Sequence, residues 1–347
     1  MSSVSVVIPC YNYGHFLPDC VDSVLTAQPG VDVRVLVIDD ASTDDSAEVA
    51  KRMAASDSRI EVIAHEANAG HLATYNEGLL GWADGSYSVL LSADDQLTPG
   101  ALTRACALLD AHPEIGFSYG HPLQFLHPGP PPPARTHGKG WSVWPGQWWL
   151  ERRFRAAQGC ITSPEVVMRT SLLQRVGGFD ARLPHTGDIE LWMRLAAYAD
   201  VGYVRGVDQA CYRVHAHNMS KSRDVLGDLA QRRLAYEVTL ERCAGVLAGR
   251  REELSDAVHR KLAWQALWYA ARAYDRGRTD QIPVDGLIAF ARDCWPEVRT
   301  LSSFWGLRAR QGIGPAVMPY LQPLILTAAA RKAHNWWWWQ SWQRRGI

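Results

Sequence analysis

Short apolar segments alternate with amphipathic helical segments over roughly the first 120 residues of the chain. The pattern predicts strands at residues 4–8, 33–38, 60–63 and 87–91, and helices at residues 14–27, 45–55 and 71–83. Ser42 and Asp44 are candidate caps of the second helix. Nearly all-apolar strands that alternate with helices form parallel sheets covered on both faces. The sequence therefore predicts an α/β, Rossmann-like fold with a mainly parallel sheet flanked by helices.

Polar residues follow these strands, where open α/β sheets bind their ligands. The three segments are Pro9-Cys10-Tyr11-Asn12, Asp39-Asp40-Ala41-Ser42 and Asp94-Asp95. The paired acids have three explanations: helix caps, a metal site, or contacts to a polar ligand. Taken alone, neither pair of acids distinguishes among these three explanations.

Composition excludes several classes of protein. The 36 basic residues balance the 36 acidic residues, so the chain lacks the excess positive charge that nucleic-acid binding requires. The seven cysteines are widely spaced and form no Cys-x-x-Cys motif, which argues against structural zinc and a disulfide framework. The N-terminus has no signal-peptide pattern, and we expect a cytoplasmic protein with reduced thiols.

The middle and the end of the chain depart from this alternation. A Pro-rich loop is predicted at 126–146, and the tryptophans around it favour either core packing or an acceptor-side lid. We predict one domain over 1–223 and a helical region over 224–347, with helices at about 226–248 and 252–276. The Trp-rich, basic tail either packs on protein or contacts the inner face of a membrane. Homo-oligomer formation stays open.

Several short motifs occur in a defined order along the first 220 residues. After the three segments above come Asn68-x-Gly70 and Asn76-x-Gly78, Val176-Gly177-Gly178-Phe179-Asp180, Gly187-Asp188 with the helix that follows, and Tyr212-Arg213-Val214-His215. This series resembles the family-2 inverting glycosyltransferases with the GT-A fold, over about residues 4–220. The resemblance does not cover the helical region.

The resemblance implies a nucleotide-sugar donor. Residues that match Pro9, Tyr11 and Asp39 line the base pocket in that family. Tyr11 can stack on a base, and the Asp39 carboxylate can accept the imide N–H of uracil or thymine, so we expect a UDP- or dTDP-sugar. We also predict nucleotide contacts for Asn12, His71 and Asp94.

The resemblance also implies a divalent metal and a catalytic base. Asp95 and His215 are the predicted ligands of Mn²⁺ or Mg²⁺, with His217 as a second choice for the imidazole. Asp188 is the predicted general base, although Gly187 stands where the family usually has an acid. A single base implies one in-line displacement with inversion. Acceptor contacts are predicted at Trp141, Thr162, Glu190 and Trp192; the acceptor is a glycan, a lipid-linked glycan or a small molecule.

Two other functions remain as alternatives. A sugar-phosphate nucleotidyltransferase would hold a triphosphate with a Gly-rich, basic loop after the first strand, and residues 9–15 contain no Lys or Arg. A non-catalytic carbohydrate-binding scaffold would not need Asp95 and Asp188, and both are present.

Overall fold

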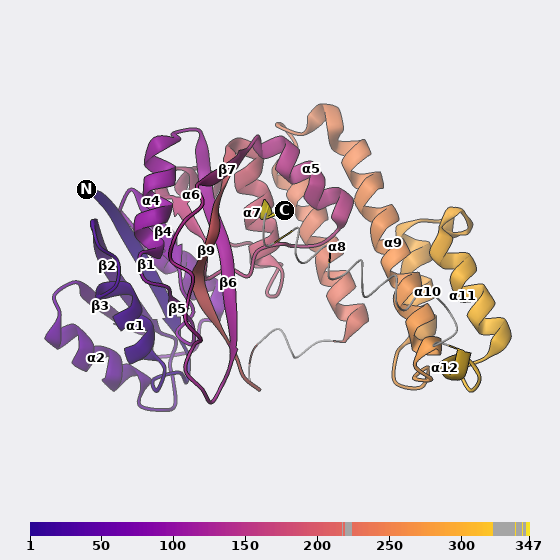
Figure 1. Cartoon of the computed structure of the whole chain (residues 1–347), viewed down its shortest axis with the longest axis horizontal. Coiled ribbons are helices and arrows are strands. Elements are labelled where there is room, and N and C mark those ends of the chain that lie inside the picture. Colours follow the sequence, from indigo (N-terminus) through magenta and orange to yellow (C-terminus); the bar gives the residue numbers. More distant parts are fainter. Residues whose placement is uncertain (217, 219–223, 322–336, 338–341, 343–344) are drawn as a thin grey trace. The chain divides into compact units, whose positions relative to one another are not determined.

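The computed structural model describes residues 1–216, 218, 224–321, 337, 342 and 345–347 (Figure 1). These residues divide into two compact units. The first takes Met1–Leu150, Cys160–Asn218 and the last residues of the chain, and the second takes Glu151–Gly159 and the helices from residue 224 onward. The grouping of 151–159 with the C-terminal helices was not predicted from the sequence.

Four parallel strands open the sheet of the first unit, and they are the four predicted strands. They are β1 (Ser2–Cys10), β2 (Val31–Asp39), β3 (Ile60–Ala64) and β4 (Tyr87–Leu90), in the order β3-β2-β1-β4. Cys10 pairs with Asp39 at the carboxyl ends of β1 and β2. The residues that follow these two strands therefore begin at the same edge of the sheet.

The rest of the sheet is mixed. It comprises β5 (Gln96–Leu97), β6 (Ile115–Leu126), β7 (Trp141–Trp144), β8 (Val167–Arg169) and β9 (Asp200–Val214). Strand β8 runs antiparallel to both β4 and β6, whereas β6 and β9 are parallel. The fold class predicted from the sequence is confirmed, with the parallel part confined to the first four strands and the β6–β9 pair.

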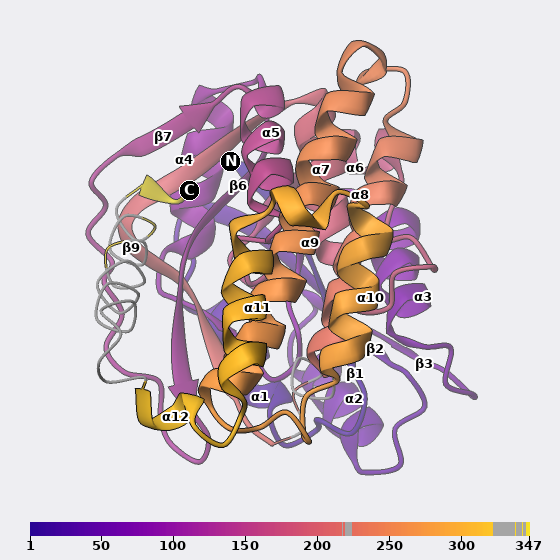
Figure 2. The ribbon, with the colours of Figure 1, turned by 90° about the vertical axis from the view of Figure 1, so that its right-hand side faces the viewer.

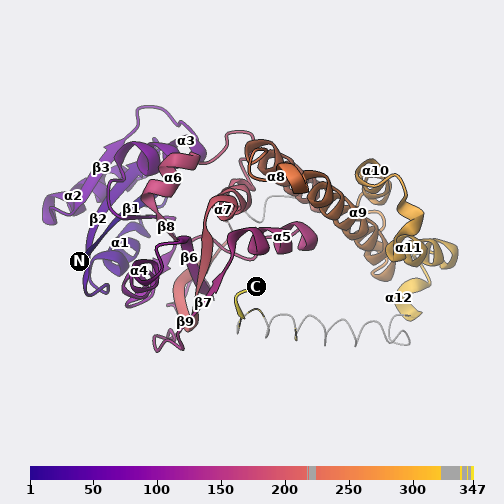
Figure 3. The same ribbon diagram turned by 90° about the horizontal axis from the view of Figure 1, so that it is seen from above.

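Helices cover the sheet on both faces. They are α1 (Leu17–Leu25), α2 (Ser46–Ser56), α3 (His71–Asn76), α4 (Ala101–Ala111), α6 (Thr170–Val176) and α7 (Gly187–Tyr198). Helix α5 (Gly146–Ala156) begins in the first unit and ends in the second. Seen from above, α1 and α4 lie on one side of the sheet, and α3 and α6 lie on the other (Figure 3). A π-helical turn, Glu77–Trp82, continues α3.

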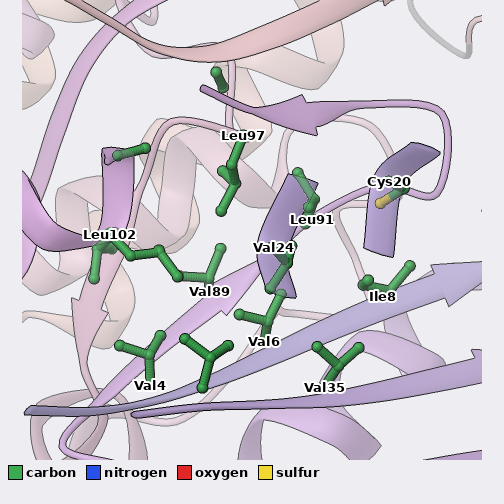
Figure 4. Close-up of a cluster of buried hydrophobic side chains, with 14 of the residues drawn as sticks. Val4, Val6, Ile8, Cys20, Val24, Val35, Val89, Leu91, Leu97 and Leu102 are labelled. Carbon is green, nitrogen blue, oxygen red and sulfur yellow. The ribbon is translucent and has the colours of Figure 1, made fainter. Parts of the chain in front are cut away.

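The main core lies between the sheet and the α1–α4 face. Val6 and Ile8 of β1, Val89 of β4 and Val24 of α1 are buried there (Figure 4). Full burial of each such side chain is worth about 1.5–3 kcal/mol relative to exposure. This packing fixes the strand ends that carry the polar residues.

The 127–140 segment contains no helix or strand, as the Pro-rich sequence predicts. Of the tryptophans that follow it, Trp149 is buried and its indole N–H donates to the Tyr119 hydroxyl over 3.2 Å. Core packing therefore explains Trp149, whereas Trp141 and Trp148 remain exposed.

The second unit is helical. Helices α8 (Val225–Arg242), α10 (Val284–Cys294) and α11 (Ser302–Ile313) pack on the long helix α9 (Arg251–Asp275), and a short helix, α12 (Met318–Leu321), follows (Figure 2). Most of the Trp-rich tail lies outside the described residues, as does His217. Across the part of the chain that the structure describes, no helix is both long and apolar enough to cross a membrane.

Candidate functional site

Asn12 ties together the loops that follow β1 and β2. Its backbone is in the left-handed region, with φ 58°. Its N–H donates to Ser42 Oγ over 2.8 Å, and its Oδ1 accepts the Thr43 N–H over 2.8 Å. Ser42 therefore braces the first loop and does not cap α2; Asp44 Oδ1 instead accepts the Ser46 N–H at the start of that helix, over 3.0 Å.

Asp39 presents a carboxylate oxygen with no partner at this edge of the sheet. The side chain is only 2% exposed. Its Oδ2 accepts the Ser42 N–H over 3.2 Å, but Oδ1 is buried without a hydrogen-bond partner among the described residues. Leaving a buried acceptor unpaired costs about 1–3 kcal/mol, so this oxygen suits a ligand N–H. Pro9 is half-buried and Tyr11 is 48% exposed on the same strand end and loop.

Asp40, the second acid of this pair, has a structural task. Its carboxylate accepts hydrogen bonds from the Ala69 and Gly70 N–H groups and lies 2.8 Å from His65 Nδ1. Burial works to raise the pKa of Asp40, but these hydrogen bonds outweigh it and lower that pKa. Asp40 thereby fixes the loop that leads into α3.

Asp94 and Asp95 meet the end of β9. His215 Nε2 lies 2.9 Å from Asp94 Oδ2. Asp95 Oδ1 accepts the Arg213 N–H over 2.9 Å, and the Arg213 guanidinium donates to the Asp94 carbonyl over 2.8 Å. The Tyr-Arg-x-His segment and the paired acids therefore form one cluster, although they are more than a hundred residues apart in the sequence.

The carboxylates of this cluster act on one another, and together with Asp188 they act on Tyr75. Burial, followed by the charge of Asp94, raises the pKa of Asp95 well above its usual range. Burial also raises the pKa of Tyr75, and the charges of Asp188, Asp94 and Asp95 add to that rise. A single tyrosine ring on α3 thus lies within electrostatic reach of all three carboxylates, which brings the predicted base and the predicted metal ligands to one place.

Asp188 stands in the first turn of α7. Its Oδ2 accepts a hydrogen bond from Ser163 Oγ over 3.3 Å, and its Oδ1 accepts the Ile189 N–H over 2.8 Å. The N-terminus of a helix favours a negative charge at this position. A Cβ at Gly187 would come within 3.1 Å of the Phe179 ring, so an acid at 187 would require that ring to shift.

Glu190 was predicted to contact the acceptor, and the structure places it elsewhere. Glu190 is fully buried, and both of its carboxylate oxygens bind the Arg194 guanidinium, at 2.8 and 2.9 Å. Arg194 also donates to the carbonyls of Val176, Gly177 and Gly178. With both oxygens occupied, Glu190 holds the loop before Phe179, and we do not retain it as an acceptor contact.

The other three predicted acceptor residues differ in where the structure places them. Trp192 is buried against Phe117 and is likewise not retained. Trp141 packs edge-on to His112, which follows α4, so the structure does not bring it to the carboxylates. Thr162 is half-buried and next to Ser163, the partner of Asp188. Of the predicted acceptor residues, Thr162 is the one that adjoins a residue in contact with Asp188, the predicted base.

His71, at the start of α3, faces the segment before α7. Its Nε2–H donates to the Pro184 carbonyl over 2.8 Å, and its ring packs on Tyr75. A contact with a nucleotide would fall to Nδ1.

Sequence reasoning missed two residues of this site. Glu165 is buried beside Asp188, and Arg213 adds a buried guanidinium next to Asp94 and Asp95. The Tyr-Arg-x-His motif contained Arg213, but the imidazole alone was considered. No local pattern marks Glu165, because its role depends on the turn that precedes β8.

The donor set for a metal is incomplete in the protein itself. Among the residues that the structure describes, no group of three or more His, Cys, Asp or Glu side chains could hold a metal ion. Asp94 and Asp95 do supply the hard carboxylate oxygens that Mg²⁺ and Mn²⁺ prefer, and a cation beside them would offset the mutual repulsion seen at Asp95. The pair fits a metal whose remaining ligands come from a diphosphate or from water.

Comparison with known proteins identifies relatives of this chain. Residues 5–172 match the family model described as glycosyl transferase family 2. The chain is 35% identical over 101 residues to the uncharacterized glycosyltransferase EpsJ of Bacillus subtilis (29% of this chain and 28% of EpsJ). It is 36% identical over 98 residues to the uncharacterized glycosyltransferase YibD of Escherichia coli (28% of each chain). The chain therefore spans less than a third of the length of these two relatives.

Among solved structures, residues 1–349 of TarS from S. aureus in complex with UDP-GlcNAc share the fold. The TM-score is 0.59 at 16% sequence identity, with 92% of this chain and 90% of that chain covered. Residues 5–172, just under half of the chain, therefore match glycosyltransferase family 2, and the chain shares the GT-A fold of this structure.

Proposed function

We propose that the chain transfers a sugar from a UDP- or dTDP-sugar to an acceptor hydroxyl, with inversion at the anomeric carbon and with Asp188 as the general base. The observation that supports this proposal is that Asp94, Asp95 and Asp188 all lie close enough to Tyr75 for their charges to add to the rise in its pKa. One molecule can then contact the diphosphate-binding acids and the base together.

The unpaired Asp39 oxygen supports uracil or thymine as the nucleobase of the donor. Uracil and thymine carry an imide N–H that can donate to Oδ1, whereas cytosine has only an acceptor at that position. Tyr11, exposed beside this strand end, would stack on the ring, and Pro9 and Asn12 would shape the pocket. UDP-GlcNAc bound to TarS, a protein of the same fold, is consistent with a uridine donor.

Asp95, with Asp94 and His215 beside it, would hold Mn²⁺ or Mg²⁺. The metal would supply Lewis-acid neutralisation of the leaving diphosphate. Arg213 adds a fixed positive charge at the same place. Together these groups would favour departure of the nucleoside diphosphate.

Asp188 would take the proton of the acceptor hydroxyl as its oxygen bonds to the anomeric carbon. The bond from that carbon to the diphosphate oxygen breaks on the opposite face, and the electron pair leaves with the diphosphate. Ser163 holds one oxygen of Asp188, which leaves the carboxylate fixed but still in place to accept a proton. Thr162, the neighbouring residue, would contact the acceptor.

The decisive variant is Asp188→Asn, because Asn keeps the shape and removes the base. Release of UDP or dTDP from a panel of nucleotide sugars, with Mn²⁺ and a mixed acceptor pool, should fall by about 10²–10⁴-fold relative to wild type. Asp22→Asn, on the exposed face of α1, is the matched control and should keep wild-type turnover.

Three outcomes would count against the proposal. Unchanged turnover in Asp188→Asn would remove the base assignment. Pyrophosphate release from a nucleoside triphosphate and a sugar phosphate would favour the nucleotidyltransferase. Sugar binding without turnover in wild type would favour a carbohydrate-binding scaffold.

A further inference from the structure

Glu165 is a buried acid in the turn that leads into β8, and the mechanism above leaves it unused. It is only 2% exposed. Its Oε1 accepts the Thr162 N–H over 2.7 Å, while Oε2 is buried without a hydrogen-bond partner among the described residues. The Val166 N–H closes the same turn on the Ser163 carbonyl over 3.1 Å. Glu165 therefore holds residues 162–166 in one conformation.

That turn presents Ser163 to the proposed base. Ser163 has φ 99°, which a residue with a side chain rarely adopts, so the fold must hold it there. Its hydroxyl donates to Asp188 Oδ2 over 3.3 Å. The hydrogen bond from Thr162 to Glu165 spans Ser163, so the Glu165 side chain constrains the residue that contacts the base.

We propose that Glu165 is a positioning residue for Asp188, acting through the 162–165 turn and through its own charge, in a site where position 187 carries glycine and no acid. The proposal rests on the proposed role of Asp188. It follows from two contacts, Thr162 to Glu165 and Ser163 to Asp188, and from the tight approach of Gly187 to Phe179.

The electrostatics support a role beyond folding. Burial raises the pKa of Glu165 to about 7, and the charge of Asp188 adds to the rise. The ionisable groups that act with Glu165 are Asp188, Asp95 and Tyr203. As Glu165 loses its proton near neutral pH, its negative charge increases the proton affinity of Asp188, which strengthens the base.

The test is the pH dependence of turnover in Glu165→Gln, with the full chain, Mn²⁺ and the nucleotide sugar that wild type uses. Glutamine keeps an acceptor for the Thr162 N–H and removes the ionisation. We expect kcat at pH 8 to fall about 10-fold, less than the ~10²–10⁴-fold expected for a base itself, with an unchanged KM for the donor. We expect wild-type kcat to rise between pH 6 and 8, and this rise should disappear in Glu165→Gln. Glu48→Gln, on the exposed face of α2, is the matched control and should match wild type.

Wild-type kcat and an unchanged pH profile in Glu165→Gln would overturn the proposal while Asp188→Asn remains inactive. If Asp188→Asn keeps full turnover, both this proposal and the base assignment fall. Should Glu165→Gln fail to fold, Glu165→Asp decides the matter. A lowered kcat with an unchanged donor KM in Glu165→Asp would support the proposal, and a wild-type kcat in that variant would overturn it.

Discussion

At the scale of single residues, the site contains buried acids whose carboxylate oxygens are not all hydrogen-bonded. Asp39 and Glu165 each keep one carboxylate oxygen without a partner among the described residues, although each side chain is only 2% exposed. Such groups lower stability, and they persist where binding or catalysis uses them. The sequence indicated Asp39 through its place after a strand. It gave no sign of Glu165, because the burial of that residue depends on the turn before β8.

Glu165 should make the stability of the protein depend on pH. Its pKa is raised from 4.5 to about 7 in the folded state, first by burial. A carboxyl with a raised folded-state pKa contributes stability that is present below pH 4.5 and is lost as pH rises through about 7. Over that window wild type should lose up to about 3 kcal/mol relative to Glu165→Gln.

Urea unfolding of both proteins at pH 5, 6, 7 and 8 measures this difference, and Glu48→Gln serves as the control. Parallel pH dependence of wild type and Glu165→Gln would mean that Glu165 is not the group that titrates.

At the scale of elements, the start of α7 is held by a clamp that sequence reasoning misassigned. Glu190 and Arg194 are four residues apart on one helix, a spacing that forms ion pairs. This four-residue spacing can be read from the sequence. The sequence cannot show that Arg194 also donates to three successive carbonyls before Phe179. Phe179 in turn packs beside Gly187, one residue before the base.

Breaking this clamp should be costly. Arg194→Met leaves Glu190 as an unpaired buried charge, so we expect a loss of about 3–5 kcal/mol in the free energy of urea unfolding. Arg182→Met, whose guanidinium is half-exposed beside Asp180, should cost about 1 kcal/mol or less. The double variant Glu190→Met with Arg194→Met should recover part of the loss, because neither charge is then left alone. A cost below about 1 kcal/mol for Arg194→Met would contradict the clamp.

The sequence predicts some strands of the sheet and not others, for a physical reason. The first four strands carry continuous apolar segments bounded by polar residues, and all four were predicted. Strands β6 and β9 were not, because polar and glycine residues such as Gly116, Ser118 and Gly120 interrupt the pattern. Their pairing also contains register shifts, which no sequence period reveals.

At the scale of the whole molecule, the first unit carries all the proposed chemistry. The site draws on the ends of β1, β2 and β4, the end of β9, the start of α7 and the turn before β8. The ordered motifs, through the family resemblance, predicted most of these residues as one series. In the structure, His215 contacts Asp94, and the charges of Asp94, Asp95 and Asp188 all act on Tyr75. Among the residues described for the helical second unit, none is assigned a role in the proposed reaction.

In the proposed reaction, Asp95 would bind the metal-bound diphosphate, and Asp188 would act only on the acceptor. Calorimetric titration of UDP in the presence of Mn²⁺ separates these roles in one measurement. We predict that Asp95→Asn weakens UDP binding about 100-fold, which corresponds to about 2.7 kcal/mol, and that Asp188→Asn changes it by less than about threefold. Wild-type UDP affinity in Asp95→Asn, or equal losses in both variants, would contradict the account.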